Sequence, residues 1–257
     1  ILLVTTRRAD MIHKEISRLV HVLAEARSIT VLTGAGVSAE SGVPTFREAQ
    51  TGLWERYDPQ ELATPEAFAA DPALVWRWYQ FRRDMILRVD PNPGHRALAE
   101  LERLVPDFAL ITQNVDGLHE RAGSANVIEF HGNLFVDRCS REGTTVSACS
   151  GREPPTCPDC GAPVRPGVVW FGEAIPESCL ENAYNAVRNC DVFLSVGTSS
   201  LVYPAAGLVD LARDAGAVLV EINPEPTAIA DRVDFALAGR SGDVLPDLVN
   251  RLIDHKS

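Results

Sequence analysis

The sequence predicts an α/β protein, a doubly wound parallel sheet that carries a smaller lobe. Short apolar runs of strand length alternate with helical segments along most of the chain, which favours a parallel sheet. A glycine-rich turn follows the first of these runs, as in Rossmann-like folds. Two regions interrupt the alternation: one is helical and aromatic without a strand, and the other is rich in Cys, Pro and Gly. We therefore expect one domain over residues 1–257, with a Rossmann-like part at about 1–47, 92–136 and 167–257, and a small lobe at about 48–91 (helical) and 137–166 (cysteine-containing).

The elements follow from hydrophobic spacing. Apolar residues recur at helical spacing in residues 11–26, and further helices are expected at 72–87, 95–104, 177–188, 204–215 and 244–253. Short apolar runs predict strands at 29–32, 108–112, 127–130, 192–196, 218–222 and 233–237.

Composition limits the classes of function. The chain has 257 residues, 46% hydrophobic and 23% charged, as in ordinary globular proteins. No run approaches the ~20 apolar residues that span a bilayer. The net charge of −11 argues against binding of a nucleic-acid backbone, although it could attract basic proteins. The first residues place a basic pair after an apolar stretch, so we expect no signal peptide, and cysteines without a disulfide pattern indicate the cytoplasm.

The glycine-rich turn is the main indication of a ligand site. Gly34, Gly36 and Ala39 fit the G-x-G-x-x-G/A spacing, which permits a tight turn and close approach to a pyrophosphate. A turn that merely needs small residues would be about as good an explanation of this spacing. Residues 44–47 then read Pro-Thr-Phe-Arg, which adds an aromatic ring and a cation where a plain Rossmann unit would continue its helix.

The cysteines of residues 137–166 indicate a metal site. Cys157-Pro-Asp-Cys160 has the spacing of a zinc knuckle, in a segment with too few apolar residues to fold by burial alone. Cys139 is followed three residues later by Glu142, where a zinc ribbon would place a second cysteine. The fourth ligand could be Cys149, Glu142 or nothing, and a redox pair or a metal-free loop is the alternative. The remaining Cys179 and Cys190 are expected to be core thiols.

Polar residues follow four of the predicted strands, where ligands bind in open α/β sheets. Amide, carboxylate, imidazole and hydroxyl groups come directly after these strands in Gln113, Asn114 and Asp116, in His131, in Gly197, Thr198 and Ser199, and in Asn223 and Glu225. A histidine at such a position suits a general base. The alternatives are helix capping by Asn114 or Asp116, a structural histidine, and ordinary polar turns. The other histidines lack a comparable context.

Together these motifs resemble the sirtuin family, the NAD-dependent protein deacylases. The resemblance spans nearly the whole chain, in matching order and spacing. It rests on residues 34–38, 44–47, 112–116, His131-Gly132, Val168-Val169-Trp170-Phe171-Gly172-Glu173, Gly197-Thr198-Ser199 and Asn223.

The resemblance implies a reaction and a set of roles. The acyl-lysine oxygen attacks C1′ of the nicotinamide ribose, nicotinamide leaves, and the acyl group ends on ADP-ribose. His131 would be the base, and Asn114 and Asp116 would orient the ribose and carboxamide. Val169, Gly172 and Glu173 would pair with the substrate backbone as an added strand. The resemblance also implies one structural zinc on Cys139, Cys157, Cys160 and Cys149, and NAD contacts from Gly34, Ala35, Gly36, Ser38, Phe46, Arg47, Trp54, Gln113, Asn114, Asp116, Gly197, Thr198, Ser199, Asn223, Glu225 and Ser241.

The sequence differs from the family pattern at two places, and one predicted helix carries a motif that indicates a branch of the family. Glu142 replaces a zinc cysteine of many members, and the loop at 48–54 is one residue longer than in some. Tyr79 and Arg82 share a helix face, and Arg82 has no acidic residue three or four positions away. This Tyr-x-x-Arg resembles the class III branch, which removes succinyl, malonyl and glutaryl groups. The alternative is Arg82 stacked on Trp78 or paired with a distant carboxylate.

We therefore expect an enzyme that removes acetyl and acidic acyl groups from protein lysines and releases nicotinamide and O-acyl-ADP-ribose. We expect it to bind acylated proteins and to bind neither nucleic acid nor a membrane. A protein mono-ADP-ribosyltransferase and a non-enzymatic NAD-sensing interaction module are the alternatives.

Overall fold

A computed structural model describes residues 2–45, 57–147, 151 and 153–257. Its main sheet is parallel and has six strands in the order β3-β2-β1-β7-β8-β9. This is the doubly wound order, which confirms the fold class expected from the sequence. The strands are β1 (Ser28–Thr33), β2 (Asp107–Thr112), β3 (Val127–Glu129), β7 (Val192–Val196), β8 (Val218–Asn223) and β9 (Phe235–Ala238).

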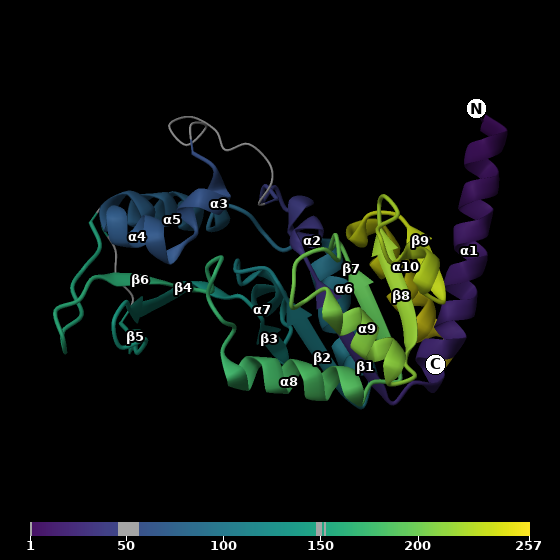
Figure 1. Ribbon diagram of the computed structural model, residues 1–257. Helices are drawn as coiled ribbons and strands as arrows, with labels where there is room; N and C mark the ends of the chain where they lie inside the picture. The colour runs from purple at the N-terminus through teal and green to yellow at the C-terminus, as the bar shows by residue number, and fades with distance from the viewer. Residues whose placement is uncertain (1, 46–56, 148–150, 152) are drawn as a thin grey trace.

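Helices cover both faces of this sheet (Figure 1). One face carries α1 (Leu2–Glu25), α6 (Pro93–Leu104) and α10 (Ser241–Lys256), whose buried residues Leu19, Leu98 and Leu248 share a core with β1. The other face carries α8 (Glu177–Arg188) and α9 (Gly207–Asp214), which bury Val187 and Leu208 against β7. A sheet covered on both sides needs continuously apolar strands, and β7 is buried at all five positions. No helix of the described residues combines the length and apolarity required to cross a bilayer.

The strand order reverses between β1 and β7, which pair with each other in parallel register. The chain leaves β1 into α2 (Ala35–Ala39) and leaves β7 into the loop that begins at Gly197. In doubly wound sheets a crevice opens at such a reversal, beyond the carboxyl ends of the strands. The topology therefore places the glycine-rich turn of the sequence beside the Gly197 loop.

The small lobe lies at one end of this body (Figure 1). It contains α3 (Pro59–Leu62), α4 (Pro65–Ala70) and α5 (Pro72–Ile86), as the aromatic and helical composition predicts. It also contains an antiparallel sheet in the order β5-β4-β6, made of β4 (Gly132–Cys139), β5 (Thr145–Val146) and β6 (Val164–Val168). Sequence analysis missed this sheet, because β4 mixes charged, polar and apolar residues. Both β4 and β6 continue across the expected lobe boundaries.

Two predicted elements begin later than expected, and several begin earlier, most of all the first helix. In the predicted strand at 233–237, the first two residues form a bend after the 3₁₀ turn over Ala230–Arg232, so β9 begins at Phe235. The predicted helix at 204–215 begins at Gly207, after turns at 203–206. The first helix extends back to Leu2, beyond the expected start at residue 11, and α7 (Leu118–Ala122) was not predicted.

A buried ion pair joins the helical and sheet parts of the small lobe. The Arg83 guanidinium on α5 donates to Asp137 Oδ1 on β4 at 2.6 Å, and both side chains are buried, with 8% and 1% of their surface exposed. Arg83 Nε also donates to the Leu134 carbonyl at 2.7 Å. Removing one member of a buried pair is costly, because the remaining charge stays desolvated without a counterion.

We expect Asp137→Asn to lower the free energy of unfolding by about 3–5 kcal/mol. Urea denaturation followed by circular dichroism measures this effect. The matched control is Glu100→Gln, which removes an exposed ion pair with Arg103 and should cost less than about 1 kcal/mol. Equal losses in the two variants would show that the buried pair does not stabilise the lobe.

Candidate active site

A cleft of about 460 Å³ lies between the carboxyl ends of the large-sheet strands and the small lobe. It has the size of small-molecule sites. The structure brings most of the predicted site residues to this cleft: Gly34, Ala35, Gly36, Ser38, Tyr79, Arg82, Gln113, Asn114, Asp116, His131, Val169, Gly172, Glu173, Gly197, Thr198 and Ser199. Phe46, Arg47, Trp54 and Cys149 lie outside the described residues.

The glycines at the strand reversal permit a close backbone approach between two loops. A Cβ atom on Gly36 would lie 2.7 Å from the Gly197 carbonyl oxygen, and one on Gly34 would lie 2.8 Å from Thr198 Cβ. The Gly36 amide donates to that same Gly197 oxygen at 2.8 Å. The glycine spacing is therefore required at least in part by loop packing, which the sequence could not separate from approach to a ligand.

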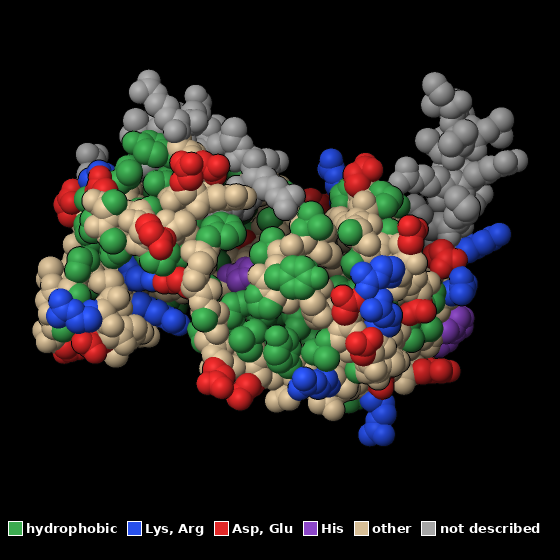
Figure 2. Space-filling view, viewed as in Figure 1, with side chains coloured by type: hydrophobic (Ala, Val, Ile, Leu, Met, Phe, Trp, Pro, Cys, Tyr) green, Lys and Arg blue, Asp and Glu red, His purple; other side chains and the backbone are tan. Residues whose placement is uncertain are grey.

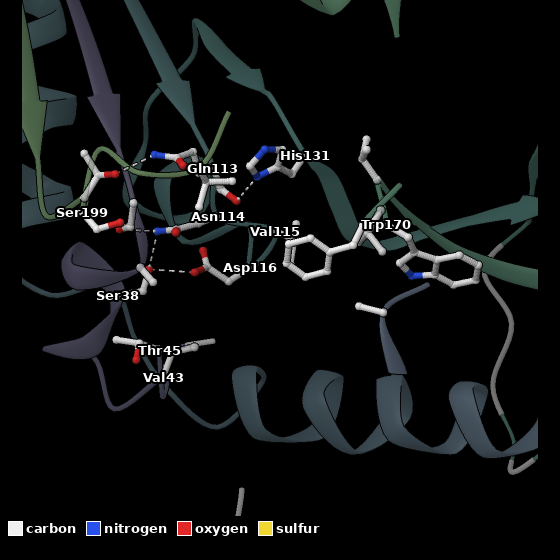
Figure 3. Close-up of a pocket in the computed structure, with 18 of the residues that line it drawn as sticks. Ser38, Val43, Thr45, Gln113, Asn114, Val115, Asp116, His131, Trp170 and Ser199 are labelled. Carbon is white, nitrogen blue, oxygen red and sulfur yellow. Dashed lines mark hydrogen bonds between the residues drawn. The ribbon is translucent and has the colours of Figure 1, made fainter. Parts of the chain in front are cut away.

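Ser38, Asn114 and Asp116 form a hydrogen-bonded group on one wall of the cleft (Figure 3). Ser38 Oγ donates to Asp116 Oδ2 at 2.7 Å, and Asn114 Nδ2 donates to Ser38 Oγ at 3.0 Å. Burial raises the pKa of Asp116, against its hydrogen bonds from the Leu118 amide and from Ser38. Asp116 Oδ1 accepts from the Leu118 amide at 2.9 Å, but the N-cap residue of α7 is Gly117, so Asp116 lies one residue before the position that the capping alternative requires.

His131 lies where β3 ends, opposite the Gln113 backbone (Figure 3). Its Nδ1 is 3.1 Å from the Gln113 carbonyl oxygen, which can only accept a hydrogen bond. This contact assigns the proton of the neutral ring to Nδ1 and leaves Nε2 as the basic nitrogen. Burial lowers the pKa of the imidazole below its ordinary 6.5, although the Gln113 hydrogen bond opposes the shift. The ring is therefore neutral at pH 7 and able to accept a proton.

The loops beyond β7 and β8 meet at Thr198. Gln113 Nε2 donates to Thr198 Oγ1 at 2.9 Å, and Asn223 Nδ2 lies 3.5 Å from the Thr198 carbonyl. Asn223 and the exposed Glu225 are not among the residues that line the described cleft. Ser241 is also outside that lining: its hydroxyl donates to Glu40 Oε1 at 2.7 Å, at the start of α10.

Two buried histidines behind this wall were missed by sequence reasoning. His95 Nε2 is 3.4 Å from Ser38 Oγ, and His119 Nε2 is 3.0 Å from Thr33 Oγ1. Their rings lie 4.8 Å apart between centroids. Burial lowers the pKa of His95 to about 4 and that of His119 well below its ordinary value. The Asn92–His95 capping box was the available local signal, but it does not show that the ring faces a site.

Tyr79 and Arg82 reach the cleft from α5. The Tyr79 hydroxyl accepts a hydrogen bond from Trp170 Nε1 at 2.8 Å. The Arg82 guanidinium lies 5.0 Å from the Trp78 ring centroid, a cation–π contact that sequence analysis gave as the alternative. Arg82 nevertheless borders the same cleft as Tyr79, so this contact does not remove it from the site.

The predicted substrate strand follows β6. Val169 N donates to the His131 carbonyl at 2.8 Å, and Gly172 has a positive φ of 86°. The Glu173 carboxylate accepts from Arg165 Nη2 and from the Trp170 amide, each at 2.8 Å. It is therefore held by the protein itself.

Exposed apolar side chains lie along the rim. Phe171 follows β6, and Val202 and Tyr203 follow β7; all three are exposed and line the cleft. Hydrophobic side chains gather in the middle of the face seen in Figure 2, around the hollow between the lobes. A rim of this kind suits an apolar stretch of bound ligand or peptide.

Cys139, Cys157 and Cys160 form a cluster in the small lobe, with all three Sγ atoms within 4.8 Å of one another. Glu142 directs its backbone N–H, rather than its carboxylate, to Cys139 Sγ at 3.4 Å. Among the described residues, the group contains neither Glu142 nor the predicted core thiols Cys179 and Cys190. Soft thiolate donors at this spacing fit Zn²⁺.

Comparisons with known proteins agree with this geometry. Residues 34–204 match the Sir2 family. The chain is 53% identical over 243 residues to NAD-dependent protein deacylase 1 of Pseudomonas aeruginosa, which covers 91% of this chain and 97% of that protein. It is 52% identical over 240 residues to NAD-dependent protein deacylase of Methylococcus capsulatus, with coverages of 90% and 94%. It superposes on a Sir2 homologue–NAD complex with a TM-score of 0.89 at 47% identity, with coverages of 94% and 95%. The chain therefore belongs to the Sir2 family, the sirtuins.

Proposed function

We propose that this protein is an NAD-dependent protein-lysine deacylase. The observation that carries the proposal is the convergence of a neutral, proton-accepting His131 and the Ser38–Asn114–Asp116 group on one cleft at the strand reversal. NAD and an acylated lysine would be the two substrates. The products would be nicotinamide, the free lysine and O-acyl-ADP-ribose.

The residues of the cleft divide into three roles. The Gly34–Ala35–Gly36 turn and the Gly197 loop would enclose the phosphates and ribose of NAD beyond β1 and β7. Asn114 and Asp116 would orient the nicotinamide carboxamide and its ribose, held by Ser38. His131 would accept the proton of a ribose hydroxyl through Nε2, so that this hydroxyl attacks the acyl carbon.

The cleft is proposed to accept acidic acyl groups in addition to acetyl. Tyr79 and Arg82 supply a hydroxyl and a guanidinium to the same pocket, which can hold a terminal carboxylate by charge-assisted hydrogen bonds. A carboxylate entering an apolar channel needs such donors to offset its desolvation. Succinyl, malonyl and glutaryl lysines are therefore proposed substrates beside acetyl-lysine.

One experiment tests the reaction and its acyl range together. The protein is incubated with NAD and peptides of one sequence that carry acetyl-, succinyl- or crotonyl-lysine, and the products are weighed by mass spectrometry. We expect loss of the acyl group with one O-acyl-ADP-ribose for each nicotinamide. A gain of ADP-ribose on the peptide would instead indicate a mono-ADP-ribosyltransferase. Absence of nicotinamide release with every peptide would indicate an NAD-sensing module.

The small lobe is proposed to hold one structural Zn²⁺ on Cys139, Cys157 and Cys160, remote from the chemistry. Three converging thiols in a segment with little apolar content support this assignment. The free state of the described cysteines also supports a reducing, cytoplasmic location.

We expect Cys157→Ser or Cys160→Ser to lose the bound zinc and to loosen residues 137–166, because a site with three described thiol ligands cannot easily spare one of them. Mass spectrometry of the metal content and limited proteolysis measure the two effects. Cys179→Ser is the control, since Cys179 lies outside the thiol cluster, and it should retain the metal. Less than about half an equivalent of zinc in the wild type, purified without chelators, would favour a metal-free lobe.

A further inference from the structure

We propose that Trp170 is a positioning residue for acyl-group selection: its indole N–H fixes the Tyr79 hydroxyl as a hydrogen-bond donor toward an acidic acyl group. The inference rests on the proposed function and extends it to a residue that does not itself touch the acyl carboxylate. It concerns the contact from Trp170 Nε1 to the Tyr79 oxygen, which is 2.8 Å long and buried.

The direction of this hydrogen bond follows from the chemistry of its partners. An indole N–H can only donate, so the Tyr79 oxygen must accept, and the single Tyr79 hydrogen remains for another acceptor. Burial raises the pKa of Tyr79 to about 12, despite the nearby Arg82 charge, so the phenol keeps that hydrogen at neutral pH. Tyr79 is only 2% exposed and lines the cleft, so the acceptor would be a group bound there.

The indole is itself held in place by Arg165 and Glu173. The Arg165 guanidinium lies 3.3 Å from the Trp170 ring centroid, and Trp170 is only 3% exposed. Arg165 donates from both Nη1 and Nη2 to the Glu173 carboxylate, at 2.5 and 2.8 Å. Glu173 also accepts from the Trp170 backbone amide, which ties the backbone and the ring of Trp170 to one carboxylate.

This arrangement gives the Glu173 carboxylate a role in addition to the expected pairing of this residue with the substrate backbone. A chain of contacts connects the Glu173 carboxylate to the acyl end of the cleft: Glu173 binds Arg165, Arg165 packs on the Trp170 ring, and Trp170 donates to Tyr79. Figure 3 places Trp170 across the pocket from Ser38 and Ser199, at the end distant from the proposed NAD contacts. A side chain there can influence which acyl group binds without entering the ribose chemistry.

The test uses Trp170→Phe, which removes the N–H and keeps an aromatic ring under Arg165. The ratio of kcat/KM for succinyl over acetyl peptide should fall by about 3- to 10-fold, the effect of one neutral hydrogen bond. The change should appear as a higher KM for the succinyl peptide more than as a lower kcat. A structural defect would lower kcat for both peptides together.

A double-mutant cycle with Tyr79→Phe identifies the route. If Trp170 acts through the Tyr79 hydroxyl, Trp170→Phe should change the ratio by less than about twofold once that hydroxyl is absent. An equal fall in both backgrounds would overturn the proposal. Trp76→Phe is the matched control, because Trp76 is a buried indole of α5 whose Nε1 donates to the Gly151 carbonyl instead. This control should leave the ratio unchanged.

The outcomes separate this inference from the proposed function. A wild type that removes acetyl but not succinyl groups would overturn the acidic-acyl proposal and this inference with it. A ratio that responds to Tyr79→Phe but not to Trp170→Phe would overturn the inference alone. Should Trp170→Phe not fold, the indole ¹⁵N–¹H signal of Trp170 in the wild type replaces it. That signal should shift more with succinyl than with acetyl peptide, and equal shifts would overturn the inference.

Discussion

His131→Ala should fold normally and lose at least ~100-fold in turnover, the typical range for removal of a general base. The neutral ring bonded at Nδ1 to the Gln113 carbonyl leaves Nε2 as the proton acceptor, and alanine cannot replace it. His131→Tyr should show the same loss. Nicotinamide-coupled deacylation of an acetyl peptide at saturating NAD measures turnover, and circular dichroism measures folding.

The pH profile gives an independent measure of the same group. Because burial lowers the pKa of His131, its base form persists below the ordinary value of 6.5. Activity should therefore stay level from pH 8 down to about 6.5 and fall only as the pH drops through the lowered pKa. An acid limb centred above the ordinary histidine value would contradict the assigned environment.

The control for this substitution is His21→Ala, since His21 is exposed and stacks edge-on against His255 far from the cleft. It should keep wild-type turnover. Near-normal turnover in His131→Ala would remove His131 from the mechanism, whatever the behaviour of the control.

Arg82→Met should raise KM for succinyl peptides by the equivalent of ~2–3 kcal/mol, a roughly 30- to 150-fold change, the loss of a hydrogen bond between charged groups. Deacetylation should be nearly unchanged or improved, because an acetyl group offers Arg82 nothing to bind and a half-buried cation has left the channel. Tyr79→Phe should act in the same direction with a smaller effect. Steady-state kinetics with succinyl and acetyl peptides of one sequence measures both variants.

Arg77→Met is the matched control, because Arg77 lies on the same helix and pairs with the exposed Glu153. It should leave both activities unchanged. Equal reductions of desuccinylation and deacetylation in Arg82→Met would show that Arg82 stabilises the lobe through its Trp78 contact. The acidic-acyl proposal would then be wrong, while the deacylase proposal would stand.

Much of the large domain could be predicted from the sequence, because its strands are buried on both faces. β7 is apolar at four of its five positions, so a short run identifies it without knowledge of its neighbours. The location of the motifs at strand ends could also be predicted from the sequence, because the carboxyl ends of parallel strands meet at one edge of the sheet. Asn114 and His131 follow different strands, and they line one cleft because those strands end at the same edge.

The small-lobe sheet and the contacts of its side chains could not be predicted in the same way. The Asp137 side chain on β4 is buried because Arg83 on α5 supplies a counterion. From the sequence alone a charged residue is expected to be exposed, so this burial could not be predicted. His95 and His119 carry no local motif for a site, and only the packing of α6 and α7 brings their rings together.

The sequence by itself determined the doubly wound sheet, the cysteine knuckle and the residue types at the strand ends, because periodicity and spacing are local properties of the chain. The tertiary structure decided which of those residues meet and what each one binds. It assigned Glu173 to Arg165, gave the Tyr79 hydroxyl its Trp170 donor, and separated Ser241 from the cleft. Such pairings depend on residues far apart in the chain, and only the packed fold brings their atoms within hydrogen-bonding distance.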